Sequence, residues 1–269
     1  MSVESQRAPW VASADQAPSL ATRVGATLAL LIGVICYVTG LAGFLYFVWF
    51  VEGVGAPKGI DAGLATPVWS AVAIDAGLLA FFAGIHSLMA RPGFKAWWTR
   101  IVPHSLERSV YVAVAGLSLL LLSWQWCPLT AVIWRVDNTL AAGALLGLSV
   151  AGWLLAFVST FLINHFDMLG LRQVYLAWRR KAYTSLPFRT PLFYKLIRHP
   201  MMLGLLIAFW AAPQMTTGHL LLALALTAYI LLAVRFLEER DLVAALGEDY
   251  VAYQRATPML VPFIRRRRS

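Results

Sequence analysis

The chain has 269 residues, of which 60% are hydrophobic and only 13% are charged, and its mean hydropathy is +0.70. Soluble domains carry about 25% charged residues, so this composition excludes an ordinary soluble domain and predicts an integral membrane protein. The net charge of +9 does not indicate a nucleic-acid partner, because a basic excess in a hydrophobic chain is typical of loops that face anionic lipid.

Residues 1–22 are predicted to form a flexible cytosolic leader, because they contain prolines and acidic residues and lack the apolar core of a signal peptide. Five apolar stretches follow, and about 20 residues are needed to cross the hydrocarbon core of a bilayer. They span 24–51, 68–90, 109–127, 139–163 and 201–237. The last stretch is too long for one crossing and is interrupted from Pro213 to Gly218, so we predict a hairpin with arms 201–214 and 218–237.

The positive charges predict how the chain is oriented. If both chain ends lie in the cytoplasm, 20 of the 22 Lys and Arg residues fall on the cytosolic side, and only Lys58 and Arg135 fall outside. We therefore predict an all-α, polytopic transmembrane bundle with about six crossings, four helices plus the C-terminal hairpin. The bundle forms a single domain over 23–269.

Polar residues from distant parts of the sequence are predicted to meet at the cytosolic depth of this bundle. They are His86; Asn164, His165 and Asp167; Arg198 and His199; and Glu238 and Glu239. Helix ends are polar wherever they leave a bilayer, which explains any one cluster, but anchoring needs only Lys, Arg, Trp and Tyr. The density of His and carboxylate groups favours a polar pocket capped by helix ends. Asp75, in the middle of 68–90, is predicted to be a buried tie between helices, or else the deep end of a substrate pocket.

The string from Arg198 to Gly204 (RHPMMLG) resembles the RHPxYxG signature of membrane methyltransferases related to isoprenylcysteine carboxyl methyltransferase and phospholipid methyltransferase. As in that family, an apolar hairpin, an acidic pair and a Tyr-rich tail follow. The resemblance implies a cofactor-binding part over about 190–262 and S-adenosylmethionine as the cofactor. The residues that it implies for binding are Arg198, His199, Glu238, Glu239, Tyr250 and Tyr253. Met202 stands where Tyr is usual, which weakens the case for a prenylcysteine or lipid substrate.

A second resemblance lies in the N-terminal half. The string from His86 to Pro92 (HSLMARP), with Lys95, the pair Glu107-Arg108 and Tyr111, is similar to the NnrU-like membrane proteins. Together with the 164–173 segment and the hairpin, the whole chain resembles the methanethiol S-methyltransferases. This resemblance implies an enzyme of the bacterial cytoplasmic membrane that converts methanethiol to dimethyl sulfide at a site facing the cytosol.

Methylation of a thiol requires a base, because the thiolate is the nucleophile. Histidine titrates near neutral pH, which favours His86 or His165 as this base, with Asp167 able to orient either ring. The predicted catalytic residues are His86, His165, Asp167 and Asn164. No metal site is predicted, because the two cysteines match no metal-binding spacing.

Two alternatives stay open from the sequence. The acceptor of the methyl group could be a larger lipophilic molecule such as a prenylcysteine or a lipid. The chain could also be a non-catalytic, haem-associated membrane protein, with His86 and His165 as the axial ligands.

Overall fold

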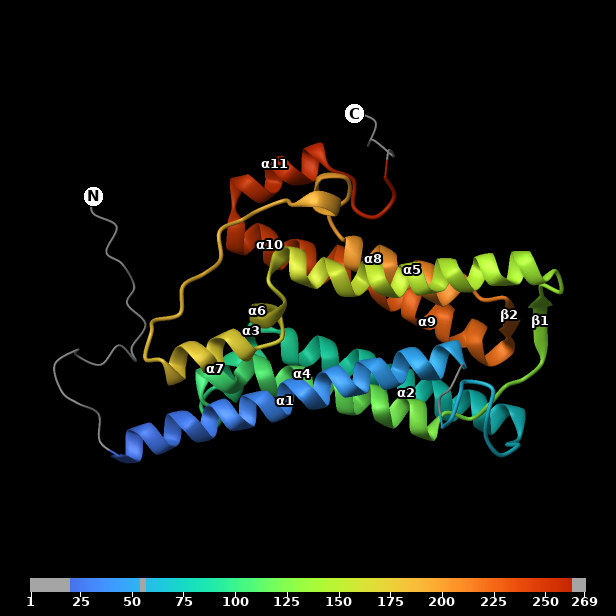
Figure 1. The fold of residues 1–269 in the computed structure, drawn as a ribbon, viewed down its shortest axis with the longest axis horizontal. Helices are drawn as coiled ribbons and strands as arrows, with labels where there is room; N and C mark the ends of the chain where they lie inside the picture. Colours follow the sequence, from blue (N-terminus) through green and yellow to red (C-terminus); the bar gives the residue numbers. More distant parts are fainter. Residues whose placement is uncertain (1–19, 54–56, 263–269) are drawn as a thin grey trace.

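The structure is a computed structural model that describes residues 20–53 and 57–262 (Figure 1). Its elements are α1 (Leu20–Glu52), α2 (Val68–Ala90), α3 (Pro92–Trp98), α4 (His104–Gln125), β1 (Val132–Arg135), α5 (Thr139–Ile163), α6 (His165–Met168), α7 (Leu171–Trp178), the 3-10 turn η1 (Leu192–Lys195), α8 (Pro200–Trp210), β2 (Gln214–Thr216), α9 (Thr217–Ala233), the π-helical turn η2 (Val234–Glu238), α10 (Glu239–Leu246) and α11 (Glu248–Ala256). The predicted leader lies outside the described residues, apart from its last three residues, which already belong to α1.

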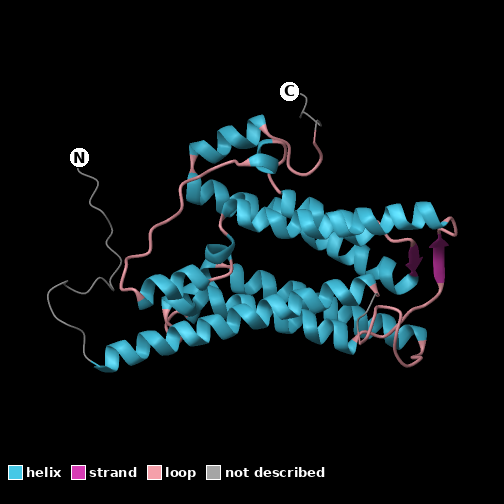
Figure 2. Cartoon of the chain, viewed as in Figure 1, coloured by secondary structure: helices cyan, strands magenta, loops and turns pink. Residues whose placement is uncertain are grey.

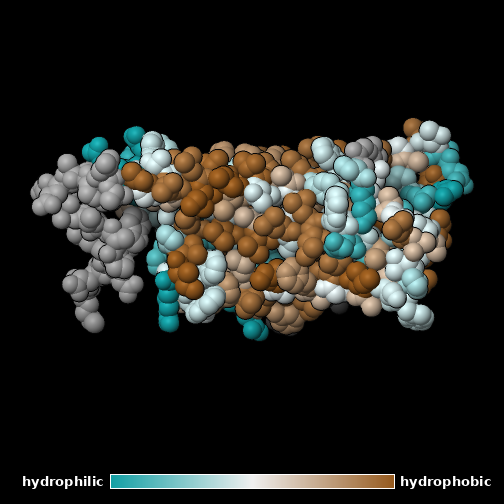
Figure 3. Space-filling view, turned by 90° about the horizontal axis from the view of Figure 1, so that it is seen from below, coloured by the Kyte–Doolittle hydropathy of each residue, from teal (hydrophilic) through white to brown (hydrophobic). Residues whose placement is uncertain are grey.

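Five helices in the described part of the chain are long and apolar enough to cross a membrane. They are α1, α2, α4, α5 and the continuous helix Thr217–Leu246. Exposed apolar side chains cover the middle of the molecule (Figure 3), and the Trp69 side chain is 85% exposed. Such a surface suits lipid and not water. The prediction of an all-α, polytopic membrane protein is confirmed, whereas the number of crossings and their orientation stay predictions.

The predicted break in the last apolar stretch is present, but the first arm of the hairpin is shorter than expected. The helix α8 ends at Trp210, and residues 214–216 form β2, which pairs antiparallel with β1. A helix of 11 residues rises only about 16 Å, roughly half of the hydrocarbon thickness. The predicted arm 201–214 was therefore too long, because pairing with the distant strand β1 replaces its last helical turn.

The helices form two half-bundles that lie side by side (Figures 1 and 2). In the first, α1 packs along α4, with α2 and α7 beside them; in the second, α5 packs along α8, with α9 behind. A Cβ atom on Gly152 of α5 would lie 2.6 Å from the carbonyl oxygen of Gly204 in α8. Only glycine allows so close an approach of two helices. The glycine that ends the Arg-His-Pro signature is therefore a packing residue.

The two ends of the bundle differ in what they carry. We call one the strand end, where β1 and β2 pair, and the other the α11 end, where α10 and α11 lie (Figure 1). The rings of Phe47, Trp153 and Phe209 pack edge to face between the half-bundles, with centroids 5.6–6.4 Å apart.

Asp75 is fully buried and accepts a hydrogen bond of 2.9 Å from the backbone N–H of Cys127, so it ties α2 to the end of α4 as predicted.

Candidate functional site

The segment that opens α8 holds a buried ion pair at the α11 end of the bundle. Arg198 donates from Nε and Nη2 to the two carboxylate oxygens of Glu239, each at 3.0 Å. Its Nη1 donates to the backbone carbonyls of Gln254 and Thr257, at 3.0 and 2.6 Å. Such a two-pronged pair is strong and geometrically specific. Arg198 therefore joins α8, α10 and the end of α11.

Glu239 uses both of its oxygens within the protein. Besides Arg198, it accepts hydrogen bonds from His199 Nε2 at 2.5 Å, Tyr250 at 2.9 Å and Gln254 at 2.6 Å. The residue is only 8% exposed. The sequence led us to expect that Arg198 and Glu239 hold the cofactor directly, but their hydrogen-bonding groups face the protein, which favours a supporting role.

Glu238 is the member of the acidic pair that remains accessible. Its side chain is 41% exposed, and its Oε1 lies 3.6 Å from Nδ1 of His199. The two glutamates thus approach opposite nitrogens of one ring, although neighbouring side chains of an α-helix point about 100° apart. The π-helical turn η2, which ends at Glu238, widens the helix at this point. Such turns frequently mark functional sites.

His199 carries a positive charge across most of the accessible pH range. Burial by itself lowers the pKa of His199, but the hydrogen bonds and charges of Glu238 and Glu239 outweigh this effect and raise it from 6.5 to about 9. The charged ring then bridges two carboxylates.

This pKa predicts how stability depends on pH. Because the folded-state pKa of His199 lies above the ordinary value, its stabilising effect is complete below pH 6.5 and is lost as the pH rises through about 9. We expect the thermal unfolding midpoint of the purified protein in detergent to fall across this interval. The fall should be much smaller in His199→Asn. A midpoint of the parent protein that stays constant or rises from pH 6.5 to 9 would contradict the assignment.

The residues of the NnrU-like string contact one another across α2, α4 and the C-terminal helices. The hydroxyl of Tyr111 lies 2.8 Å from Nε2 and 3.2 Å from Nδ1 of His86. Ser87 and Tyr229 share a hydrogen bond of 3.1 Å. Two further contacts are the ion pairs Arg91–Asp241 at 3.2 Å and Lys95–Glu107 at 3.9 Å. These contacts place His86 at the junction of α2, α4 and α9.

Glu238 connects this junction with the Arg198 cluster. Burial and the negative charge of Glu238 together raise the pKa of Tyr194. The same carboxylate lies within electrostatic range of the hydroxyls of Tyr111 and Tyr229. The charge of one accessible acid thus acts on three tyrosines, from η1, α4 and α9. Tyr194 and Tyr229 were not predicted, because no local pattern distinguishes them from ordinary aromatic residues.

The other predicted catalytic residues form a separate network. His165 is 3% exposed, and its ring nitrogens contact the hydroxyls of Thr160 at 2.7 Å and Tyr37 at 3.0 Å. Asp167 forms an ion pair of 2.7 Å with Arg172. Asn164 caps α6 by accepting from the backbone N–H of Asp167. The structure shows no hydrogen bond from Asp167 to His86 or His165 within the described residues. This geometry fits a tie between α1, α5 and α6.

Tyr250 and Tyr253 support the Arg198 cluster from α11. The Tyr250 hydroxyl donates to Glu239, and the Tyr253 hydroxyl donates to the carbonyl of Tyr194 at 2.5 Å. Both rings pack against Phe188. Their hydroxyls are therefore directed at the protein.

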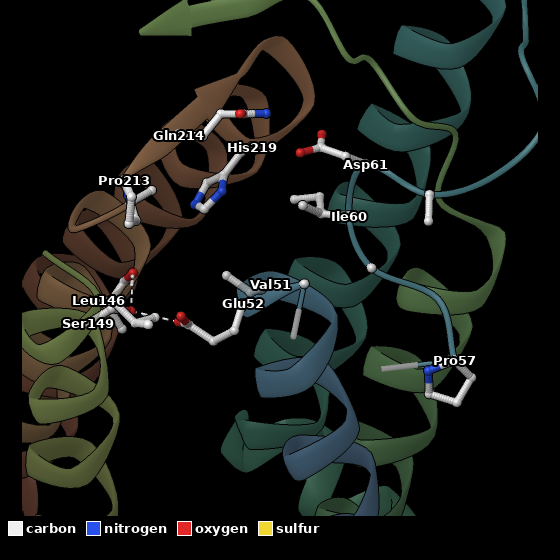
Figure 4. Close-up of a pocket in the computed structure, with 15 residues that line it drawn as sticks. Val51, Glu52, Pro57, Ile60, Asp61, Leu146, Ser149, Pro213, Gln214 and His219 are labelled. Carbon is white, nitrogen blue, oxygen red and sulfur yellow. Dashed lines mark hydrogen bonds between the residues drawn. The ribbon is translucent and has the colours of Figure 1, made fainter. Parts of the chain in front are cut away.

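A cavity of about 530 Å³ lies at the strand end (Figure 4). Glu52, Asp61 and His219 are among the residues that line it, and none of the predicted site residues does. The Glu52 carboxylate accepts hydrogen bonds of 2.6 Å from Ser149 and from the Trp153 indole. This cavity lies at the opposite end of the bundle from Arg198 and Glu239, so we do not assign the predicted chemistry to it.

The fold and the α11-end cluster define a polytopic membrane protein with a polar site between helix ends, and comparison with known proteins identifies its class. A family model described as NnrU protein matches residues 76–264, so the chain belongs to the NnrU family. The chain is 50% identical to the methanethiol S-methyltransferase of Mycobacterium tuberculosis over 236 residues, which cover 88% of this chain and 96% of the relative. It is 49% identical to the methanethiol S-methyltransferase of Crocosphaera subtropica over 238 residues, covering 88% and 93%.

A more distant relative is Nurim of Sus scrofa, with 37% identity over 180 residues, covering 64% of this chain and 68% of that protein. No solved structure matches the chain. The predicted membership in the methanethiol S-methyltransferase group is confirmed, and the chain is a methyltransferase of the membrane.

Proposed function

We propose that this protein methylates methanethiol to dimethyl sulfide with S-adenosylmethionine, at a site on the α11 end of the bundle. The observation that supports this site most directly is the accessible Glu238 carboxylate beside His199, held next to the buried Arg198–Glu239 ion pair. Relatives that share about half of its residues carry the name of this activity. The predicted topology puts 20 of the 22 Lys and Arg residues on the cytosolic side, which supports a site facing the cytosol, where the cofactor is made.

The residues around Glu238 fit a cationic cofactor. S-adenosylmethionine would supply an electrophilic methyl group on a sulfonium. Glu238 offers an accessible carboxylate, and its charge acts on the aromatic residues Tyr111, Tyr194 and Tyr229. A carboxylate beside aromatic rings suits a cation, because the faces of such rings are electronegative. Arg198 and Glu239 would stabilise this arrangement through their hydrogen bonds within the protein.

His86 is the residue of this chain best placed to accept the thiol proton. The ring is half-buried, and it lies at the junction that carries Tyr111 and Tyr229. The apolar surroundings favour the reaction, because charges on the sulfonium and the thiolate neutralise each other in the transition state. A histidine also remains neutral near pH 7 and is thus ready to accept a proton.

The function is tested with detergent-purified protein, S-adenosylmethionine and methanethiol, by following dimethyl sulfide in the headspace. We expect time-dependent dimethyl sulfide and an equal amount of S-adenosylhomocysteine. A parallel reaction with a prenylated cysteine should give no methylated product. Turnover of the prenylated cysteine without any dimethyl sulfide would replace our proposal with the larger-acceptor alternative.

Substituting Glu238, with Glu248 as the control, tests the proposed cofactor site. We expect Glu238→Gln to weaken S-adenosylmethionine binding by about 10-fold to 100-fold, because it removes one charged hydrogen-bonding partner. The unfolding midpoint should change little, since this side chain is 41% exposed. Equilibrium dialysis with labelled cofactor measures the affinity, and Glu248→Gln, on the exposed side of α11, is the control. Unchanged affinity in Glu238→Gln would exclude this acid from the cofactor site.

A further inference from the structure

The Tyr111 hydroxyl is the only hydrogen-bonding partner of the His86 ring among the described residues. It lies 2.8 Å from Nε2 and 3.2 Å from Nδ1. A single hydroxyl has one proton and cannot satisfy both ring nitrogens with good geometry. One nitrogen of His86 is therefore left without a well-aligned partner among the described residues.

Aromatic contacts restrict how the His86 ring can turn. The ring of Phe82 stacks on it at a centroid distance of 5.4 Å, and Tyr229 packs edge to face at 6.4 Å. The ring of Tyr111 also packs against it, with the two ring centroids 5.0 Å apart. Three rings and one hydroxyl thus fix the orientation of a histidine that is only half-buried.

We propose that Tyr111 is a positioning residue that holds His86 with one ring nitrogen free to accept the proton of the thiol substrate. This inference rests on the proposed function. The thiol S–H bond breaks and its proton passes to His86, while the sulfur forms a new bond to the methyl carbon. The bond between the methyl carbon and the sulfur of the methyl donor breaks, and its electron pair stays on that sulfur. His86 later releases the proton to solvent.

The Tyr111 hydroxyl has a second effect on this step. Once His86 accepts a proton, both of its ring nitrogens become donors, and the tyrosine oxygen can accept from the one that faces it. A hydrogen bond to a charged group is stronger than one to a neutral group. Tyr111 therefore stabilises the protonated ring more than the neutral ring, which is the requirement for assisting catalysis.

The acceptor that fits this arrangement is a small neutral thiol. Phe82, Tyr111 and Tyr229 surround His86 closely, and a small apolar molecule offers no polar group apart from its S–H. The charged and titratable groups that act on Tyr111 are Tyr229 of α9, Glu238 of η2, and Glu107 and Arg108 of its own helix. The test variants keep all four, so they form a constant background.

The test compares Tyr111→Phe with the parent protein in the headspace assay. We expect kcat near neutral pH to fall about 10-fold to 100-fold, with the KM for S-adenosylmethionine unchanged. As the pH rises, more thiolate forms in solution, so the kcat of Tyr111→Phe should approach that of the parent protein measured at the same pH. Tyr175→Phe, which changes an exposed tyrosine of α7, should have no effect at neutral or alkaline pH.

A double variant separates positioning from a structural role. If Tyr111 acts through His86, the Tyr111→Phe/His86→Ala protein should be no slower than His86→Ala alone. Equal kcat for Tyr111→Phe and the parent would overturn the proposal. So would a loss that adds to that of His86→Ala and persists at alkaline pH. A parent protein that makes no dimethyl sulfide would instead remove the proposed function.

Discussion

His86→Ala is expected to lower kcat for dimethyl sulfide formation by about 100-fold to 10,000-fold at neutral pH, the usual contribution of a positioned general base. The binding of S-adenosylmethionine should change little, because His86 lies with Tyr111 and Phe82 and not in the Arg198 cluster. Single-turnover kinetics together with equilibrium dialysis measure the two effects separately.

His165→Ala provides the comparison for this experiment. Its ring is held by the hydroxyls of Thr160 and Tyr37, so we expect a loss of stability and a much smaller loss of kcat in the folded protein. Unchanged turnover in His86→Ala would remove His86 as the base. A large loss of kcat in a stably folded His165→Ala protein would instead return that role to His165.

Glu239→Ala is expected to destabilise the protein by about 3–5 kcal/mol, the usual result of removing one partner of a buried ion pair. The substitution leaves the Arg198 side chain, which is only 11% exposed, and the buried ring of His199 without their main counter-charge. The hydrogen bonds from Tyr250 and Gln254 would also be lost. Denaturant titration in mixed micelles measures this change in the free energy of unfolding.

Asp241→Ala is the matched control, because it breaks a more exposed ion pair on the same helix. The side chains of Arg91 and Asp241 are 31% and 48% exposed, so this pair should contribute at most about 1 kcal/mol. Glu239→Gln should fall between the two variants, since it keeps the shape of the side chain but removes its charge. If Glu239→Ala were as stable as Asp241→Ala, the cluster would not support the fold.

Glu238→Gln and Glu239→Ala together distinguish two roles that the sequence motif alone does not separate. Glu238 and Glu239 are neighbours in the chain, and the family resemblance implies the same role for both. The structure gives Glu239 five hydrogen-bond donors and leaves Glu238 with an accessible carboxylate beside His199. Loss of stability is therefore expected at one position and loss of affinity at the other.

The membrane helices were predictable because the signal for each is local. A crossing requires about 20 consecutive apolar residues, and this pattern is visible without any knowledge of the neighbouring helices. The second and fourth apolar stretches match α2 and α5 at both ends. The third helix begins at His104, five residues earlier than predicted, because its first turn is polar but still helical after Pro103.

The candidate site was predictable only in part. The resemblance indicated that the start of the hairpin and the acidic pair meet, and Arg198 and His199 do contact Glu239. Tyr194 and Tyr229 were missed, since each lies in a run of apolar or aromatic residues with no distinctive spacing. The charge of Glu238 acts on both of them across elements that are far apart in the chain.

Membrane insertion, the course of the helices and the family could all be inferred from the chain alone, because hydrophobic length and short motifs are properties of consecutive residues. Which hydrogen-bonding groups are already used within the protein became known only from the packing of the helices. This packing places Arg198, Glu239 and His165 in internal networks, and it leaves the Glu238 carboxylate accessible and one nitrogen of His86 without a well-aligned partner. The physical reason is that a buried polar group must find a partner, and the partner is supplied by whichever helix packs against it.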